Sequence, residues 1–456
     1  MTARRFTLPV YVISLGCPKN FVDTQTLLGG LPSEPRLVER PEDAALVLIN
    51  TCGFIRPAVE ESLAEILDAG LAIRGVTPKP LLAVAGCLVS RYGDDLKTGL
   101  PEVDVWLSTH ELSDWSGRIA QALNRVENRE PGQRAQAPKR AVVSFPGREP
   151  VSRFLSGPPG FAYLKISEGC RHACRFCTIP SIRGRLKSRP IADLAAEARH
   201  ILAQGRKEII LVAQDLTAYG VDLGNGITLR TLLEALLPLS GLERLRLLYL
   251  YPAGLTPTFL DFLKSAGPPL VPYFDIPLQH SHPDILKSMG RPFAKDPRRV
   301  LDLIRSRFPD AVIRTSLITG YPGETRTHFK HLINFVREAR FQHLGVFAFQ
   351  AEEGTPAAKL SGQVTMKTRQ SRRNELMAVQ AEISAQWLQS FVGRELDILV
   401  DAPHPEWPGL HTGRAWFQAP DIDGVTYVSG LGVTPGAMVK ATVEEAKTYD
   451  LVALAG

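Results

Sequence analysis

Three short apolar runs rich in β-branched residues mark the first third of the chain. They occupy residues 10–17, 45–52 and 81–87, and Gly or Pro bounds them. Continuous apolar runs of this length indicate strands that are buried on both faces of a parallel sheet. A helix is expected after Pro57, where apolar residues recur at helical spacing at Val59, Leu63, Ile66 and Leu67. The pattern predicts an N-terminal parallel-sheet α/β domain over residues 8–123.

From residue 161 onward, strand-like runs alternate with amphipathic helices. The runs occupy residues 161–166, 208–213, 244–249, 273–277, 312–318 and 343–349. One of the helices is expected to stop at Gly205, and another to begin at Thr325 as its N-cap. Six strand–helix units predict a central partial (β/α) barrel, with its site at the carboxyl ends of the strands. This domain is expected to span residues 156–388.

Two other stretches differ in residue composition and in the spacing of their apolar residues. Residues 124–155 are polar, rich in Pro and Gly, and lack an apolar stripe, which is typical of an interdomain linker. After a charged helical segment at 367–389, strand-like runs at 393–400, 426–429 and 437–443 are separated by Gly and Pro. They predict a small antiparallel β-barrel over residues 390–456, of the sort that binds RNA or protein.

Composition narrows the class of protein. The chain has 456 residues, of which 44% are hydrophobic and 22% charged, so it is expected to bury several cores. No run of eighteen apolar residues occurs and the start lacks a signal-peptide core, which predicts no membrane partner and a cytoplasmic location. The net charge of +6 is compatible with a nucleic acid or ribosomal partner. Nothing in the sequence predicts the oligomeric state.

The motif Cys170-Arg-His-Ala-Cys174-Arg-Phe-Cys177 follows the first of the six central strands. Three cysteines at this spacing fit three corners of a cubane iron–sulfur cluster, which normally takes four thiolates. No cysteine follows Cys177, so one iron is left open to a small molecule. A zinc site completed by His172 or by a distant ligand is the alternative, although zinc sites usually contain two cysteine pairs, or a cysteine pair with a histidine pair.

The other three cysteines, Cys17, Cys52 and Cys87, each end one of the N-terminal apolar runs, 35 residues apart. Because parallel strands end at one edge of a sheet, these thiols are expected to meet there. They would then bind a second cluster, again with an open iron. The alternative is that each cysteine is a small buried hydrophobic residue at a strand end.

Polar residues end several of the central strands. Gln214, Ser316 and Glu324 are candidates for holding the amino, carboxylate or ribose groups of a nucleotide-like cofactor, and ordinary loop capping is the alternative. For His280 and His282 we favour a hydrogen-bonding role over metal ligation. Four cations just after the cysteine motif could bind a carboxylate or form a solvated basic loop; they are Arg183, Arg185, Lys187 and Arg189.

The cysteine motif at 170–177 resembles the signature of the radical S-adenosylmethionine (SAM) superfamily, and Phe176 stands where that family places an aromatic residue beside the adenine. The segments at 14–20 and 50–55 resemble the ligand motifs of the methylthiotransferase family. Together with 273–280, 285–292 and 419–424, they make the chain similar to the RimO family, the ribosomal protein methylthiotransferases, from about Val10 to Asp450. The last domain resembles the TRAM domain. Asp23-Thr24-Gln25 departs from the Asp-Ser/Thr-Glu that family members commonly have.

The resemblance implies a transferase that places a methylthio group on the β-carbon of an aspartate in ribosomal protein S-twelve. It implies two 4Fe–4S clusters and SAM as cofactors, with no catalytic side chain beyond the cluster ligands. The barrel cluster would generate the radical, and the N-terminal cluster would deliver the sulfur. The expected partners are ribosomal protein S-twelve or the small ribosomal subunit, and an electron donor. One alternative is a methylthiotransferase acting on adenosine in transfer RNA; another is a non-catalytic iron–sulfur or RNA-binding protein.

Overall fold

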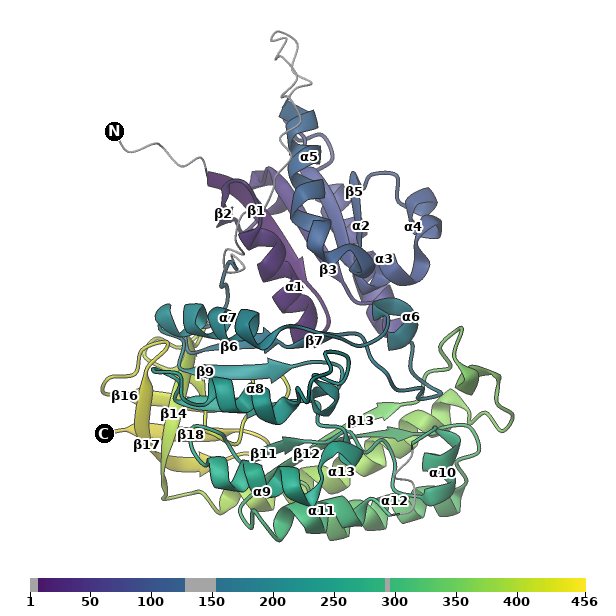
Figure 1. Ribbon diagram of the computed structural model, residues 1–456, viewed down its shortest axis with the longest axis vertical. Helices are drawn as coiled ribbons and strands as arrows, with labels where there is room; N and C mark the ends of the chain where they lie inside the picture. The colour runs from purple at the N-terminus through teal and green to yellow at the C-terminus, as the bar shows by residue number, and fades with distance from the viewer. Residues whose placement is uncertain (1–6, 128–152, 292–295) are drawn as a thin grey trace. The chain divides into compact units, whose positions relative to one another are not determined.

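The computed structural model describes residues 7–127, 153–291 and 296–456 (Figure 1). The chain forms two compact units. Unit 1 combines Met1–Ser156 with the short segment Thr178–Arg185, and unit 2 combines Gly157–Cys177 with Leu186–Gly456. The predicted α/β class, with an N-terminal parallel sheet, a central partial barrel and a C-terminal β-barrel, is confirmed.

Unit 1 contains a five-stranded parallel sheet in the order β2-β1-β3-β4-β5. The strands are β1 (Thr7–Ser14), β2 (Glu34–Leu37), β3 (Leu46–Thr51), β4 (Leu81–Gly86) and β5 (Val105–Ser108). The three predicted strands are confirmed as the central neighbours β1, β3 and β4. The edge strands β2 and β5 were not predicted, because they are only four residues long and partly exposed.

Side chains of β3 alternate between two apolar clusters, which explains its unbroken apolar run. Val47 and Ile49 pack with helix α2 (Arg56–Ala72) in one cluster, whereas Leu46 and Leu48 pack with helices α1 (Pro18–Gly29) and α5 (Trp115–Glu127) in the other. The predicted apolar face of α2 is wrong at Leu67, whose surface is 46% exposed. Because Leu67 is adjacent to the buried Ile66, it is about 100° around the helix and lies beyond the edge of the buried stripe.

Helix α5 extends through Glu127, past the predicted start of the linker at residue 124. Residues 128–152 of the predicted linker lie outside the described residues. Where the description resumes, the chain packs on α1: Phe154 N donates to Gln25 O at 3.1 Å, and Arg153 donates from Nε to Gln25 Oε1 at 3.0 Å. Arg153 is buried. The end of the predicted linker is therefore a packed segment of unit 1 and not a solvated tether.

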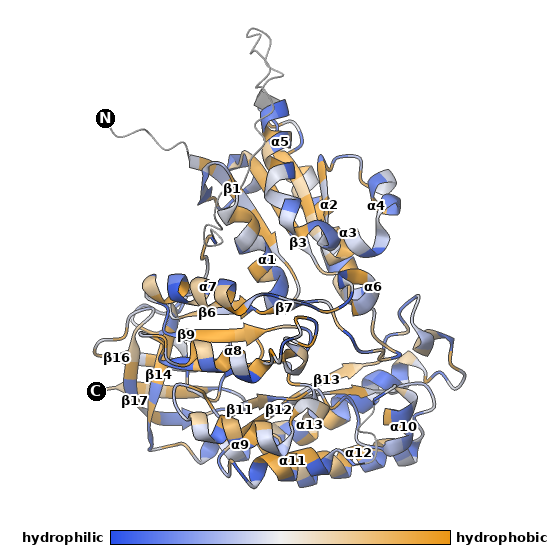
Figure 2. Cartoon of the chain, in the orientation of Figure 1, coloured by the Kyte–Doolittle hydropathy of each residue, from blue (hydrophilic) through white to orange (hydrophobic). Residues whose placement is uncertain are grey.

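Unit 2 contains six parallel strands, and the predicted partial barrel is confirmed. They are β6 (Phe161–Lys165), β9 (Glu208–Val212), β10 (Arg244–Leu247), β11 (Tyr273–Asp275), β12 (Val312–Thr319) and β13 (His343–Ala348). Two three-stranded sheets, β10-β9-β6 and β11-β12-β13, are joined by backbone hydrogen bonds from Leu245 N to Pro269 O and from Leu250 N to Asp275 O, both 2.8 Å. Strand β9 is entirely buried, and after Glu208 at its start it is apolar, so it appears mostly orange in Figure 2.

Amphipathic helices follow these strands. They are α7 (Ile191–Ala203), α8 (Leu229–Leu236), α9 (Pro257–Ala266), α10 (Pro283–Ser288), α11 (Arg298–Arg305), α12 (Arg326–Ala339) and α13 (Met366–Gln389). The predicted N-cap of α12 is confirmed, since the Thr325 side chain accepts a hydrogen bond from His328 N. Helix α7 ends just before Gly205, whose φ of +82° is in the left-handed region that glycine tolerates.

The C-terminal residues close into a barrel in the order β14-β15-β16-β18-β17. Its strands are β14 (Glu395–Pro403), β15 (His411–Arg414), β16 (Thr426–Gly430), β17 (Met438–Ala446) and β18 (Leu451–Ala455). Three of the five were predicted. Strands β15 and β18 were not, because they are short and lack a clear alternating pattern of their own. Barrel closure leaves no open sheet edge.

Candidate metal centres

The three N-terminal cysteines follow three neighbouring strands. Cys17 precedes helix α1 after β1, Cys52 directly follows β3, and Cys87 directly follows β4. The strand register pairs Ser14 with Asn50 and Thr51 with Gly86, so the strands end at the same level. The topology therefore brings the three cysteines to one edge of the sheet, as predicted. Burial, with a smaller contribution from the nearby thiols of Cys87 and Cys17, raises the pKa of Cys52 to about 11.

Glycines beside each cysteine allow this close approach. A Cβ on Gly16 would lie 2.9 Å from Cys52 Cβ, and one on Gly53 would lie 2.8 Å from the carbonyl of Cys87. A Cβ on Gly86 would lie 2.3 Å from Asn50 Oδ1. Side chains at these positions would push the strand ends apart. Three thiols brought together in this way offer soft donors, which suit iron–sulfur clusters.

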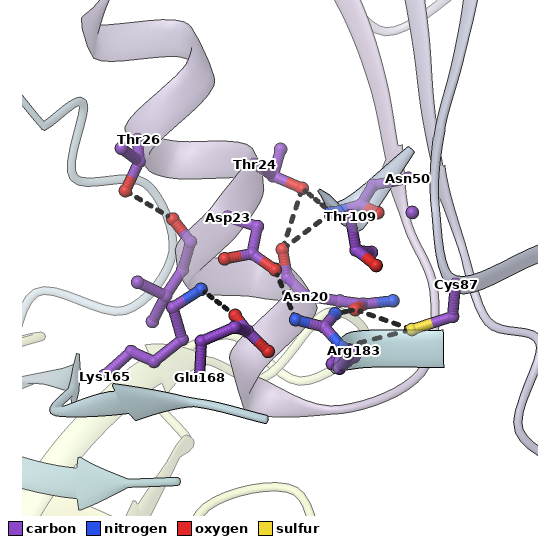
Figure 3. A network of polar contacts seen from close by, with 12 residues as sticks. Asn20, Asp23, Thr24, Thr26, Asn50, Cys87, Thr109, Lys165, Glu168 and Arg183 are labelled. Carbon is purple, nitrogen blue, oxygen red and sulfur yellow. Dashed lines mark hydrogen bonds and ion pairs between the residues drawn. The ribbon is translucent and has the colours of Figure 1, made fainter. Parts of the chain in front are cut away.

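Asn20, on the first turn of α1, ties two of the strand ends together (Figure 3). Its Nδ2 donates to Leu15 O and to Thr51 O, both at 2.9 Å. Its backbone oxygen accepts a hydrogen bond from Asn50 Nδ2 at 2.8 Å. The amide therefore positions the loop that carries Cys17 against the end of β3.

Cations modulate these thiols. Burial raises the pKa of Cys17, but the charges of Lys19 and Arg183, together with backbone hydrogen bonds from Asn20 and Lys19, lower it below its ordinary value. The pKa of Cys87 is raised by burial, and the Arg183 guanidinium opposes that rise. Arg183 donates from Nε to Cys87 Sγ at 3.3 Å (Figure 3). A thiolate at this position therefore has a built-in positive partner.

The second cysteine trio lies in a loop of unit 2. The loop follows β6 and the short strand β7 (Ser167–Glu168). Cys177 N donates to Cys174 O at 3.1 Å, and His172 N donates to Cys170 Sγ at 3.5 Å. Arg291 donates from Nη1 to Cys174 Sγ, also at 3.5 Å. Burial raises the pKa of Cys170.

Segments that follow other strands of the partial barrel hold this loop. His172 Nε2 lies 2.7 Å from Asp215 Oδ2, after β9, and its ring stacks on Tyr251, after β10, with the centroids 3.8 Å apart. Arg175 N donates to Met289 O at 3.0 Å, and its carbonyl accepts from Ala357 N at 2.9 Å. The loop therefore sits at the carboxyl ends of the strands, as predicted. The bond to Asp215 gives His172 a supporting role.

Two buried acceptor atoms beside this loop have no hydrogen-bond partner among the described residues. They are Gln214 Oε1, after β9, and Ser167 Oγ, in β7. Gln214 Nε2 is occupied, since it donates to Glu168 Oε1 at 3.1 Å. Unpaired buried polar atoms are costly and are common where a ligand completes them. An ammonium group, such as the one that SAM carries, would satisfy Gln214 Oε1.

The remaining candidates for cofactor contact differ in their surroundings. Phe176 is half-buried against an apolar cluster that includes Tyr321 and Phe349. Ser316 is half-buried in β12, and its carbonyl accepts a hydrogen bond from Gln279 N at 2.8 Å. Both stand in or after strands whose carboxyl ends surround the loop.

The carboxylate of Glu324 is enclosed by its own partners. It accepts hydrogen bonds from Gly320 N at 2.9 Å and from Arg372 at 2.6 Å, and it lies 3.3 Å from His280 Nε2. The Glu324 and His280 side chains have no exposed surface. Glu324 therefore fastens the loop between β12 and α12, which is the capping alternative raised for this residue.

Histidines near the loop between β12 and α12 act as hydrogen-bond acceptors. His280 Nδ1 accepts from His282 N at 2.9 Å, and His282 Nδ1 accepts from Asp284 N at 3.3 Å at the start of α10. The ligand atoms of His282, Asp284 and His328 lie within 4.8 Å of one another. His328 Nδ1 in turn accepts from Thr325 N in the capping box of α12, so both rings already serve helix starts.

The four cations after the cysteine motif have three different environments. Arg183 is buried in unit 1, whereas Arg185 and Lys187 are exposed. Arg189 donates to Lys165 O at 2.9 Å and to Glu197 at 2.6 Å. Sequence reasoning treated them as one group and missed the contact of Arg183 with Cys87. It also missed Arg291, although this residue lies in the 285–292 segment that carried the family resemblance; Pro292 lies outside the described residues.

Comparisons with known proteins match all three regions. Residues 9–108 match Uncharacterized protein family UPF0004, residues 164–336 match the Radical SAM superfamily, and residues 392–455 match the TRAM domain. A solved structure of the radical SAM methyltransferase TsrM from Kitasatospora setae shares the fold, with a TM-score of 0.53 and 16% identity. That likeness covers 90% of this chain and 80% of TsrM. Across the described residues, no helix has the length and apolar character needed to cross a membrane.

Relatives named ribosomal protein uS12 methylthiotransferase RimO match nearly the whole chain. The protein of Oleidesulfovibrio alaskensis is 57% identical over 98% of this chain and 100% of its own length. The protein of Lawsonia intracellularis is 51% identical over 100% of this chain and 99% of its own length. The protein of an Anaeromyxobacter species is 43% identical over 98% of this chain and 93% of its own length. The superfamily implies a 4Fe–4S cluster and SAM as cofactors, and the cysteines of the unit 2 loop fit three ligands of that cluster. The chain belongs to the RimO family of ribosomal protein uS12 methylthiotransferases, which are transferases of the radical SAM superfamily.

Proposed function

We propose that this chain transfers a methylthio group to the β-carbon of an aspartate in ribosomal protein uS12, and that it holds two 4Fe–4S clusters for this purpose. One would bind Cys170, Cys174 and Cys177, and the other Cys17, Cys52 and Cys87. The observation that carries the second cluster is the convergence of three thiols after three adjacent parallel strands, with glycines where a side chain would separate them.

The substrate explains why such cofactors are needed. A saturated C–H bond beside a carboxylate is not acidic enough for a side-chain base, so a one-electron route is required. When bound, the unit 2 cluster and SAM supply that one-electron chemistry. The protein's part is to bind, orient and shield. Three thiolates per cluster leave one metal corner open, for SAM at the unit 2 site and for sulfur at the unit 1 site.

Residues around the unit 2 loop would hold SAM. Gln214 Oε1 is the acceptor proposed for the amino group, because it is buried and lacks a partner among the described residues. Phe176, which packs on an apolar cluster, is proposed to lie beside the adenine, and Ser316 to contact the polar end of SAM. Glu324 is proposed to act indirectly, by keeping the loop between β12 and α12 in place.

The partners follow from the substrate. The chain would act on uS12, either free or within the small ribosomal subunit, and would receive electrons from a separate donor. We propose a cytoplasmic location, because a ribosomal protein is the proposed substrate.

Mass spectrometry of ribosomal proteins from a deletion strain tests the substrate. We expect uS12 to lose the mass of one methylthio group and to regain it on complementation. An unchanged uS12 mass would refute the proposal, and loss of a methylthio-adenosine in transfer RNA from the same strain would assign the chain to the alternative substrate. Iron and sulfide content after anaerobic purification tests the second cluster: about eight irons per chain are expected, whereas about four would refute it.

A further inference from the structure

A buried cation lies against one thiol of the unit 1 cysteine site. Arg183 donates from Nε to Cys87 Sγ at 3.3 Å and from Nη1 to Asp23 Oδ2 at 2.9 Å, and its Nη2 donates to Asn20 Oδ1 (Figure 3). Only 1% of the Arg183 side chain and 2% of the Asp23 side chain are exposed. One planar guanidinium thus serves a thiol, a carboxylate and an amide at fixed angles, which the single nitrogen of a lysine does not reproduce.

The short helix that presents Arg183 is fixed within unit 1. Helix α6 (Ile179–Arg183) has its Ile182 side chain fully buried. Thr109 Oγ1 donates to Ile182 O at 2.6 Å, and Thr178 Oγ1 donates to Phe54 O at 3.3 Å. These contacts hold the backbone on both sides of the arginine. The guanidinium therefore does not have to be ordered when a metal group arrives.

Arg183 comes from a distant part of the sequence. It lies outside the 9–108 match that contains Cys17, Cys52 and Cys87, and inside the 164–336 match, six positions after Cys177. The chain passes into unit 1 at Thr178 and leaves it after Arg185. The cysteine site of unit 1 is therefore assembled from two separate stretches of sequence.

The simplest role for Arg183 is to neutralise the buried Asp23. That role accounts for Nη1, but it does not account for Nε, which is directed at sulfur. Hydrogen bonds to ligand sulfurs and nearby positive charge are among the factors that set the potential of an iron–sulfur cluster, because they stabilise the more negative, reduced form. Asp23 holds the fork in place at Nη1, while Nε faces the thiol, so the positive end of the ion pair is directed at Cys87.

We propose that Arg183 is a positioning residue of the unit 1 cysteine site, and that its contact with Cys87 makes the cluster held there easier to reduce. This inference rests on the proposed function, because it requires a cluster at Cys17, Cys52 and Cys87. The same contact identifies the role of Asp23, the first residue of the segment that departs from the family's usual Asp-Ser/Thr-Glu: it holds the arginine.

The test uses the full chain with the unit 2 cysteines removed (Cys170→Ala/Cys174→Ala/Cys177→Ala), so that one cysteine site remains. After anaerobic loading with iron and sulfide, the midpoint potential is measured by a redox titration followed by electron paramagnetic resonance. Arg183→Gln is compared with Arg183→Lys and with Arg185→Gln, the matched control on an exposed side chain of the same segment. Asp23→Asn/Arg183→Gln is added so that no unpaired carboxylate stays buried.

We expect Arg183→Gln to change the ratio of reduced to oxidised cluster at least tenfold at a fixed potential, which is a fall of about 59 mV or more for one electron. The midpoint potential of the double variant should fall by a similar amount, and that of Arg183→Lys should fall less. The potential of Arg185→Gln should equal that of the parent. A loss of iron in Arg183→Gln that Arg183→Lys restores would also support the proposal.

Two results would overturn the inference, and they are distinguishable. If the parent binds iron and the potentials of Arg183→Gln and of the double variant equal that of Arg185→Gln, the arginine only balances Asp23 and the second cluster stands. If the parent binds no iron at its remaining cysteines, the second cluster and this inference fall together.

Discussion

Arg414 on β15 donates from Nη1 to Glu208 Oε2 on β9 at 2.8 Å, and this contact joins the C-terminal barrel to the partial barrel. Arg246 donates from Nε to the other oxygen of Glu208 at 2.7 Å. All three side chains are at most 2% exposed. Burial alone would raise the pKa of Glu208, but the charges of Arg246, Arg414 and Arg244 hold it at about 2. Glu208 thus pairs with two buried guanidinium groups, of which Arg414 also pairs with Asp401 at 2.7 Å.

Glu208→Gln is therefore expected to destabilise unit 2. The substitution leaves the buried Arg246 guanidinium without its charge partner, whereas Arg414 keeps its ion pair with Asp401. Removing one partner of a buried pair costs about 3–5 kcal/mol in comparable cases. The apparent free energy of urea unfolding of the metal-free protein, followed by tryptophan fluorescence, measures this loss. Glu243→Gln is the matched control, because Glu243 is 43% exposed in its pair with Lys207 and is expected to change stability by less than about 1 kcal/mol. Equal effects of the two substitutions would contradict the assigned role of Glu208.

Buried histidines predict a loss of stability in mild acid. His343 Nε2 lies 2.8 Å from Phe417 O, and burial lowers the pKa of His343, an effect that the charge of Asp423 only partly offsets. The unfolded chain takes up a proton below about pH 6.5, while the folded chain does not. The unfolded state then binds more protons, so stability falls as the pH drops below that value.

The measurement is the urea midpoint of the metal-free protein at about pH 7.5 and about pH 5.5. His343→Gln keeps a donor for Phe417 O and should shrink the difference between the two midpoints. His200→Gln, on an exposed side chain of α7, should leave the difference unchanged. If His343→Gln retains the full pH dependence, another group is responsible for it.

Substitutions in the two cysteine trios are expected to abolish different steps of the reaction. Cys174→Ala should abolish SAM cleavage, because a cluster with two remaining ligands at this loop cannot present an open iron correctly. Cys52→Ala should leave cleavage intact and stop methylthio transfer. Chromatography of 5′-deoxyadenosine under anaerobic, reducing conditions measures cleavage, and mass spectrometry of uS12 measures transfer. Loss of cleavage in Cys52→Ala would contradict this division between the sites.

The sequence predicted elements whose pattern is local. Strands β3 and β4 are buried along their whole length, whereas β1, next to the short edge strand β2, is mostly half-buried. The cysteines that follow the three strands share an edge by topology alone. Strands β2 and β5 lie at the sheet edges and bury too little surface to leave such a pattern. Leu67 shows the limit of periodicity, which indicates a helix but does not fix the width of its buried stripe.

Supporting residues were harder to foresee, because their partners are distant in sequence. Arg183 lies 96 positions from Cys87, and Arg291 lies 117 positions from Cys174. In the sequence both look like ordinary cations near a motif. Only folding reveals that one is buried beside Asp23 and that the other reaches a cysteine of the unit 2 loop. Glu324 is a different case, because its sequence position at a strand end did not show that Arg372 and His280 enclose the carboxylate.

The unpaired acceptor of Gln214 leads to the last prediction. Nothing among the described residues donates to Oε1, so a bound SAM ammonium would complete it. Removing a hydrogen bond to a charged group costs about 1.5–3 kcal/mol, which is roughly a 10- to 150-fold rise in Kd. Gln214→Ala should therefore weaken SAM binding to the reconstituted protein by that factor, as measured by equilibrium dialysis.

Gln204→Ala is the matched control, since it removes the same side chain from an exposed position at the end of α7. Glu324→Gln distinguishes a residue that contacts SAM from one that only stabilises the surrounding loop. It should lower thermal stability because Arg372 loses its buried charge partner, while the Kd for SAM changes less than in Gln214→Ala. If Gln214→Ala binds SAM as tightly as Gln204→Ala does, the unpaired oxygen marks a buried water or simple strain. The amino group of SAM must then be held by another residue at the carboxyl ends of the strands, and Ser167 Oγ is the next acceptor to test.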